Sequence, residues 1–281
     1  MVMIAGFDNL HCAGYVLGYE KAVLAGKPIA YWRLGEAKGP NAIDKTNNGH
    51  DGIFYGTPSL QQPGAIIGDE DTAVMLDGQN SYVEIPSHQD FSQPTSGQGL
   101  TIEVWFRPDL LEFAGESDDP YIHWVAKGCP RQQEWALRFY SAKSMCRPNR
   151  ISAYIFNPIG GQGVGAYFQD KLTAGEWIHV VACFDPGSAD TQGVGVSIYR
   201  DGRRRLGPPF KSTLYNSPPL RIMPVPGTAP LRLGTRDLKH FLVGALDEVA
   251  IYPRVLTPNE VWEHYQLGRG LRHYQAEPAN Y

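Results

Sequence analysis

The clearest strand signal in the chain is the sequence Gly244-Ala-Leu-Asp-Glu-Val-Ala-Ile-Tyr252. Side chains of a β-strand alternate between two faces, so Asp247 is expected to lie beside Val249 and Ile251. The opposite face would then carry Leu246, Glu248, Ala250 and Tyr252. Because both faces carry apolar residues, the pattern predicts a central strand that is covered on two sides. A carboxylate on a buried face needs a charge partner, several N–H donors or a metal ion, so Asp247 needs an explanation.

The composition of the chain indicates one large all-β domain. The chain has 281 residues, with 31 Gly, 22 Pro and 42% hydrophobic residues, and this length is sufficient for a core between two sheets. The net charge of −4 gives no general bias toward nucleic acid. No apolar run approaches the roughly 20 residues that a membrane-spanning helix needs. Residues 1–18 lack the basic start and the sustained apolar run of a convincing signal peptide.

Two helices are expected, one toward each end of the chain. Apolar residues at helical spacing predict a short helix within Gly14–Ala25. Near the C-terminus, Thr257 suits an N-cap, Pro258 suits the first helical position, and Glu260 can complete a capping box. This second helix is expected to end at Gly268.

Several segments, in the same order along the chain, carry a resemblance to a known family. They are the strand-and-helix sequence at 244–261 and the segments 28–36, 73–86, 100–108 and 176–185. Together they resemble the laminin-G-like and pentraxin-like domains, which are concanavalin A-like jelly rolls.

The resemblance implies a fold and a division of the chain. The expected fold is all-β, a two-sheet antiparallel jelly-roll sandwich over residues 28–268. Residues 1–27 would then form an N-terminal arm with the short helix, and residues 269–281 would form a C-terminal tail.

The loop that begins at Asp44 resembles half of a calcium-binding loop. Asp44, Thr46 and Asn48 alternate before a glycine, as in the pattern Asp-x-Asx-x-Asx-Gly. The twelfth position is Tyr55 rather than Glu, so the loop is not an EF-hand. The resemblance to laminin-G-like domains implies that a structural calcium ion ties Asp44 to Asp247. The alternative is that Asp247 accepts N–H bonds from the Asp44 loop without a metal ion.

Aromatic and polar side chains provide candidates for a glycan site. Glu103 and Trp105 share one face of the strand at 100–107, where a carboxylate beside an aromatic ring could contact a sugar. The alternative for this pair is ordinary packing inside the protein. Further aromatic surface is expected in exposed loops, at Tyr55, Tyr121, Tyr167 and Tyr215.

Two further features have structural interpretations. His179 lies in a two-sided core strand and is expected to be a hydrogen-bonded structural histidine rather than a ligand. Cys129 and Cys146 flank the predicted strand Trp135–Tyr140, and a disulfide between them requires an oxidising compartment. Their spacing alone does not decide whether the bond forms.

Three classes of function fit these observations. The resemblance implies a non-catalytic carbohydrate-binding or adhesion module, extracellular or at a cell surface, with a polysaccharide or glycan as its partner. The second class is a glycoside hydrolase or polysaccharide lyase of the same fold. A hydrolase needs two carboxylates that flank the bond, and neither Glu-x-Asp-x-x-Glu nor Glu-x-Asp-x-Glu occurs. The third class is a structural subunit of a surface layer or phage particle, in a homo-oligomer or larger assembly.

Overall fold

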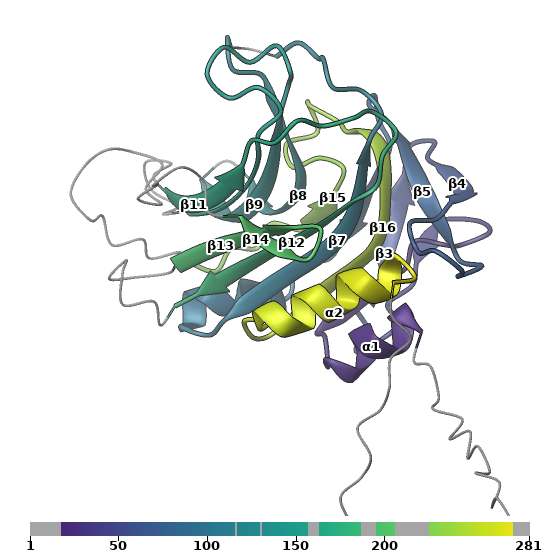
Figure 1. Ribbon diagram of the computed structural model, residues 1–281. Helices are drawn as coiled ribbons and strands as arrows, with labels where there is room; N and C mark the ends of the chain where they lie inside the picture. Colours follow the sequence, from purple (N-terminus) through teal and green to yellow (C-terminus); the bar gives the residue numbers. More distant parts are fainter. Residues whose placement is uncertain are drawn as a thin grey trace, which may run out of the picture.

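The computed structural model describes residues 18–271, apart from 116, 130, 157–162, 187–194 and 206–224. Two antiparallel sheets lie face to face as a sandwich, and two helices lie against one of them (Figure 1). This arrangement confirms the predicted all-β jelly-roll fold with two short helices. Residues 1–17, Tyr215 and the tail from residue 272 lie outside the described residues.

The first sheet contains the strand that the sequence predicts to be central. Its strands are β1 (Ala30–Trp32), β4 (Ser59–Pro63), β5 (Thr72–Asp77), β7 (Leu100–Pro108), β12 (Ile178–Asp185), β13 (Gly195–Arg200), β14 (Arg203–Arg205) and β16 (Val243–Tyr252). They follow the order β14-β13-β12-β7-β16-β5-β4, and β1 also pairs with β16. The strand β16 therefore has neighbours on both edges, as predicted.

The second sheet also has eight strands. Its strands are β2 (Asn41–Ala42), β3 (Gly52–Tyr55), β6 (Tyr82–Ile85), β8 (Tyr121–Cys129), β9 (Gln132–Tyr140), β10 (Ile151–Phe156), β11 (Gly163–Phe168) and β15 (Leu231–Leu233). They follow the order β11-β10-β9-β8-β15-β6-β3-β2.

The main core lies between the two sheets, because alternate apolar side chains of each strand point inward. The contribution of β9 is Trp135, Leu137 and Phe139. Phe106 of β7 stacks on Trp124 of β8, with 4.3 Å between the ring centroids. The inward positions are thus filled, and the opposite face of each sheet is available for other contacts.

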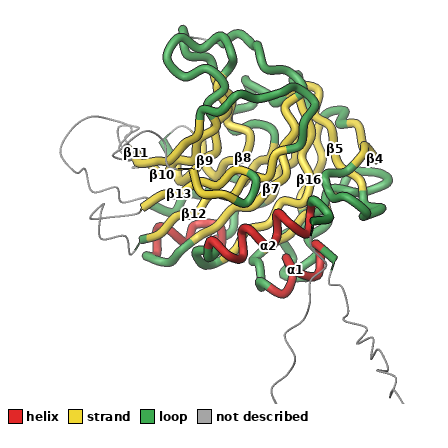
Figure 2. Tube along the Cα trace, in the orientation of Figure 1, coloured by secondary structure: helices red, strands yellow, loops and turns green. Residues whose placement is uncertain are grey.

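The two helices cover the outward face of the first sheet (Figure 2). They are α1 (Tyr19–Ala25) and α2 (Pro258–Gly268). The capping box of Thr257 and Glu260 is present, as predicted. Gly268 allows α2 to approach the sheet closely, since a Cβ atom there would lie 2.4 Å from Trp105 Cζ2. Among the described helices, none is long and apolar enough to cross a membrane.

A β-bulge interrupts the alternation of β16. Asp247 lies opposite Trp105 of β7, whereas Ala250 lies opposite Glu103, so three steps along β16 match two along β7. Glu248 lies within the bulge and has a positive φ of 54°.

The bulge makes the predicted face of Asp247 wrong. Val249 and Ile251 point into the core between the sheets. Asp247 lies opposite Trp105, and residues directly opposite in an antiparallel pair share a face. Since Trp105 belongs to the cluster under the helices, Asp247 lies on the helix-covered face.

The conjectured disulfide is not formed in this structure. Cys146 is an exposed free thiol, so no bond joins it to Cys129. Cys183 is a buried thiol in the helix-covered cluster, where it packs as a small apolar side chain.

Candidate functional site

The outward face of the second sheet carries aromatic and cationic side chains from neighbouring strands. Alternation along β9 turns Arg138 away from the core, since Leu137 and Phe139 point inward. In the next strand, β10, the same alternation turns Tyr154 and Phe156 outward. These residues form a cluster separate from the main core, and they surround Arg138.

The guanidinium of Arg138 is enclosed by aromatic rings. Its Cζ atom lies 4.6 Å from the ring centroid of Tyr121, 4.7 Å from that of Tyr154 and 5.3 Å from that of Phe156. Tyr154 and Phe156 are buried, whereas Tyr121 and Arg138 are only half-buried. Cation–π contacts of this kind hold the guanidinium in place.

His123 accepts a hydrogen bond from Arg138 and does not neutralise its charge. The Nε atom of Arg138 donates to His123 Nε2 at 2.9 Å, which requires an unprotonated Nε2. Burial lowers the pKa of His123 well below its usual value, and the charges of Arg138 and Arg236 lower it further. His123 is therefore a neutral acceptor at physiological pH.

Arg236, which follows β15, adds a second positive charge with unsatisfied donors. Its Nε and Nη1 atoms are buried and have no hydrogen-bond partner among the described residues. Burial lowers the pKa of Arg236, and the nearby charge of Arg138 lowers it further. The adjacent Asp237 contacts His240 instead, at 3.2 Å. Within the described ranges, no carboxylate lies within 4.0 Å of the guanidinium of Arg138 or Arg236.

We call this set the Arg138 group. Its members are Tyr121, His123, Arg138, Tyr154, Phe156 and Arg236. It combines aromatic faces with cationic donors that lack an acidic partner in the described part of the chain. An anion at this surface would be attracted by the two guanidinium charges, and it would receive charge-assisted hydrogen bonds from those N–H groups that are accessible.

A second aromatic surface lies on the same sheet. Tyr55 of β3 and Tyr82 of β6 are stacked, with 5.0 Å between ring centroids and 9° between ring planes. Tyr55 is 39% exposed, so part of one ring is available to a ligand. An exposed aromatic face of this kind suits stacking on a sugar ring.

The predicted ligand residues separate into two sets. Tyr121 belongs to the Arg138 group. The expectation that Tyr167 lies in an exposed loop is wrong, because Tyr167 lies in β11 and is largely buried, with the Cζ atom of Arg150 3.8 Å from its ring centroid. Glu103 and Trp105 lie on the other sheet, under the helices, and both are 0% exposed. The prediction of a sugar contact for this pair is therefore corrected to internal packing.

The carboxylate of Glu103 is the centre of a buried hydrogen-bond network. Its Oε1 atom accepts from Tyr19 Oη at 3.0 Å and lies 2.8 Å from His179 Nε2. Its Oε2 atom accepts from Tyr252 Oη at 2.8 Å and lies 2.9 Å from His264 Nδ1. Burial alone would raise the pKa of Glu103, but His264 and His179 hold it well below its usual value. The predicted structural role of His179 is confirmed.

The carboxylate of Asp44 accepts hydrogen bonds from backbone N–H groups near it. It accepts from the backbone N–H groups of Tyr31 at 3.0 Å, Thr46 at 3.0 Å and His50 at 3.2 Å. These bonds organise the loop between β2 and β3. They also use lone pairs that a metal ion would need.

Asp247 has different neighbours from those that the sequence predicts. Its Oδ2 atom accepts from Ala65 N at 2.7 Å, so the Asp44 loop is not the donor. Its Oδ1 atom is buried without a partner in the described part of the chain. Ligand atoms of Asp71 and Glu248 lie within 4.8 Å of it, in a group that does not include Asp44. Burial and the charge of Glu248 raise the pKa of Asp247 well above its usual value.

Glu248 has its own charge partner. Its Oε1 atom accepts from Arg33 Nη2 at 2.6 Å, and Tyr31 donates a hydrogen bond to Oε2. The same guanidinium also lies 2.8 Å from Asp69 and 3.0 Å from Asp71. Arg33 is therefore a cation that Glu248, Asp69 and Asp71 share.

Sequence reasoning did not identify Arg138 or Arg236. The alternation of β9 contains a usable signal, since Arg138 stands between two inward apolar residues. No local signal links it to Arg236, which approaches from a distant turn. Tyr121 alone of the group was predicted.

The sequence matches a family model described as the concanavalin A-like lectin/glucanases superfamily over residues 77–262. That match covers more than half of the chain. No curated protein matches the sequence of this chain.

Solved structures show the same fold at low sequence identity. Domain 4 of AbnA, an extracellular GH43 arabinanase from Geobacillus stearothermophilus solved with arabinotriose, has a TM-score of 0.53 and 18% identity, covering 85% of this chain and 98% of that chain. The binding domain of botulinum neurotoxin DC has a TM-score of 0.59 in complex with rat synaptotagmin II and 0.56 in complex with SialylT. The identities are 9% and 10%, and each match covers 88% of this chain. This chain spans only 52% of those neurotoxin chains.

Proposed function

This chain belongs to the concanavalin A-like lectin/glucanase superfamily, and from this premise we propose that it is a non-catalytic carbohydrate-binding module. The proposed binding surface is the outward face of the second sheet, centred on the Arg138 group. The Tyr55–Tyr82 stack would extend that surface for a longer chain of sugars.

The main support for the proposal is the positive charge of the Arg138 group. Neither Arg138 nor Arg236 has a carboxylate within 4.0 Å in the described ranges, so the positive charge at this surface is not neutralised there. Guanidinium groups bind carboxylate and sulfate through paired hydrogen bonds. The ligand class that fits is therefore an acidic glycan, with a uronate or sulfate group at the two arginines.

The aromatic members of the group supply the second requirement for sugar binding. The ring of Tyr121 is half-buried and lies beside the guanidinium of Arg138. A sugar ring can stack on such a face while its charged substituent reaches the arginines. The solved neighbours support this use of the fold at a coarse level, since two of them contain arabinotriose or SialylT.

The environment of Glu103 supports binding rather than hydrolysis. A glycoside hydrolase needs two carboxylates that reach the scissile bond. Glu103 is fully buried and surrounded by Tyr19, Tyr252, His179 and His264. Its carboxylate cannot contact a substrate without loss of that network.

Titration calorimetry tests the proposal with polygalacturonate and chondroitin sulfate as acidic glycans and arabinan as a neutral one. We expect the intact chain to bind an acidic glycan more tightly than arabinan. Arg138→Met should weaken that binding by roughly ten- to a hundredfold, because a hydrogen bond to a charged group contributes about 1.5–3 kcal/mol. Arg203→Met is the matched control. Arg203 belongs to β14 of the first sheet, and its Cζ atom lies 4.2 Å from the ring centroid of Trp262 in α2.

Two results would overturn the proposal. One is the absence of binding to any of these glycans, with calcium and zinc supplied. The other is equal affinity of Arg138→Met and the intact chain. Release of reducing sugars or unsaturated products from any glycan would support the enzyme class instead.

A further inference from the structure

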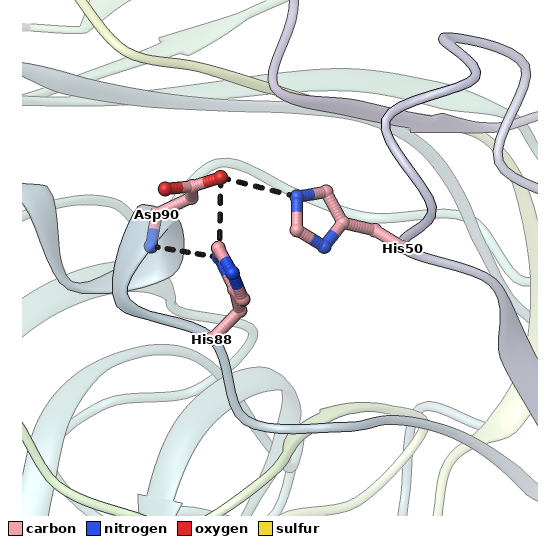
Figure 3. A group of neighbouring side chains, drawn as sticks. All are labelled: His50, His88 and Asp90. Carbon is pink, nitrogen blue, oxygen red and sulfur yellow. Dashed lines mark hydrogen bonds and ion pairs between the residues drawn. The ribbon is translucent and has the colours of Figure 1, made fainter.

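Two loops that are distant in sequence bring His50, His88 and Asp90 together. His50 lies between β2 and β3, whereas His88 and Asp90 lie between β6 and β7, at the 3-10 helix Gln89–Ser96. Figure 3 shows both imidazole rings directed toward the Asp90 carboxylate. His50 is 7% exposed, but the side chains of His88 and Asp90 are 48% and 35% exposed, so the cluster is open on one side.

The distances in this cluster match those between the ligands of a tetrahedral metal ion. Asp90 Oδ2 lies 3.2 Å from His50 Nε2 and 3.1 Å from His88 Nδ1. The three ligand atoms all lie within 4.8 Å of one another. Zinc bonds of about 2.0–2.2 Å in a tetrahedron place neighbouring ligand atoms about 3.3 Å apart. Two of the three separations therefore agree with zinc ligation without a change of backbone.

The best-anchored member of the cluster is His50. Its N–H donates to Asp44 Oδ2 at 3.2 Å, and its carbonyl oxygen accepts from Trp32 Nε1 at 2.8 Å. Its ring packs on Phe91 at 4.7 Å and on His88 at 4.8 Å between centroids. A metal ligand that is held in this way is already oriented before an ion binds.

His88 Nδ1 can serve only one of its two contacts with Asp90 at a time. This atom accepts from Asp90 N–H at 3.3 Å and also lies 3.1 Å from Asp90 Oδ2. A protonated Nδ1 suits the carboxylate contact, whereas an unprotonated Nδ1 suits the N–H contact. A metal ion between Nδ1 and Oδ2 would take the place of a proton there and would be bound by both atoms.

We propose that His50, His88 and Asp90 bind a divalent transition-metal ion of the zinc type. Two imidazoles and one carboxylate favour zinc over calcium, which prefers an all-oxygen shell. Within the described residues the group holds three ligands, so a fourth position is open to water or to a ligand atom. This site is separate from the Asp44–Asp247 calcium that the family resemblance implies, and it does not depend on glycan binding.

The consequence of an ion here is a link between the two loops. Zinc would join the segment before β3 to the segment before β7, next to the core residue Phe91. An ion that binds the folded chain alone raises its melting temperature by mass action.

The test uses the full chain without a histidine tag, after removal of metal by a chelator. Zinc is titrated calorimetrically, and cobalt serves as a spectroscopic probe of tetrahedral geometry. We expect one ion at this site and a tetrahedral cobalt spectrum. His88→Ala and Asp90→Asn should each weaken zinc binding by more than tenfold. Loss of a residue that only hydrogen-bonds to a metal ligand already weakens metal binding by about ten- to a hundredfold, and these two residues are proposed as ligands themselves. Both side chains are partly exposed, so the variants should fold.

The control is His240→Ala, because His240 and Asp237 form a similar histidine–aspartate contact at 3.2 Å outside this cluster. That variant should bind zinc as the intact chain does. The proposal is overturned if the intact chain binds no zinc. It is also overturned if His88→Ala and Asp90→Asn bind zinc as tightly as the intact chain, since the ion would then lie elsewhere.

Discussion

His264 Nδ1 of α2 lies 2.9 Å from Glu103 Oε2 of β7, where the helix covers the first sheet. The same carboxylate accepts from Tyr19 of α1. One buried charge thus connects both helices to the sandwich. The contact explains how a carboxylate can be stable at the centre of an otherwise apolar cluster.

Glu103→Gln should destabilise the chain by about 3–5 kcal/mol, the usual cost of breaking a buried charge pair. The amide would keep the shape but lose the charge that His264 requires. The free energy of unfolding in urea measures the change. Glu112→Gln is the control, because its exposed ion pair with Lys143 should contribute under about 1 kcal/mol. Equal stability of Glu103→Gln and the intact chain would contradict the structural role of the network.

Stability should fall as the pH rises through neutrality. Burial lowers the pKa of His264, but Glu103 outweighs burial and raises it above 6.5. A raised pKa in the folded state gives stability that is fully present below pH 6.5 and lost as the pH rises through the folded value. The melting temperature from pH 5.5 to about 8.5 measures this loss, and His264→Asn should flatten the slope. A variant with an unchanged slope would show that another group titrates.

Stability should also fall in acid, for the opposite reason. The pKa of Glu103 is held well below 4.5 in the folded chain, chiefly by His264 against the effect of burial. The stability from this group is present above pH 4.5 and is lost as the pH falls through the folded value. Glu103→Gln should remove that part of the acid dependence in melting experiments between about pH 2 and 5. An identical acid profile in the variant would count against the assignment.

Arg236→Met should weaken acidic-glycan binding without a loss of stability. In the unliganded chain this guanidinium is partly buried beside Arg138, and its pKa is lowered by burial and by that charge. Replacing it should leave the free energy of unfolding unchanged or raise it by about 0.5–2 kcal/mol. Calorimetry and thermal unfolding of the same variant measure both effects, with Arg203→Met as the control. Loss of stability together with unchanged affinity would contradict the functional role.

The implied calcium ion has a direct test in the melting temperature. Calcium bound to the folded chain should raise the midpoint, and a chelator should lower it. Asp247→Asn should abolish the response, since Asp247 Oδ1 is a buried oxygen without a hydrogen-bond partner in the described part of the chain. Asp44→Asn should abolish it only if the ion spans both residues. An unchanged melting temperature in excess chelator, together with no calcium found by elemental analysis, would contradict the prediction.

Several features of this protein follow from local sequence signals. The β16 sequence predicts a central strand, and β16 has neighbours on both edges. The residues Thr257, Pro258 and Glu260 predict the start of α2, where the capping box is formed. These predictions succeed because strand alternation and helix capping involve residues within a few positions of one another.

The face of β16 on which Asp247 lies could not be predicted from the alternation of side chains along the strand. The bulge at Glu248 shifts the register of β16 against β7, so Asp247 moves to the face that carries Trp105. Its position depends on pairing with a strand that is remote in sequence. A period of two residues carries no information about where that pairing is interrupted.

Both candidate sites depend on the same kind of long-range contact. The Arg138 group needs β8, β9, β10 and the turn that holds Arg236, while the metal cluster joins His50 to His88 and Asp90. The residue types are present in the sequence, but their separations in space are set by sheet order and loop packing. The sequence therefore determines the strands, the helix cap and the family, whereas chain folding determines which charges meet, because electrostatics and metal ligation act through distance in space.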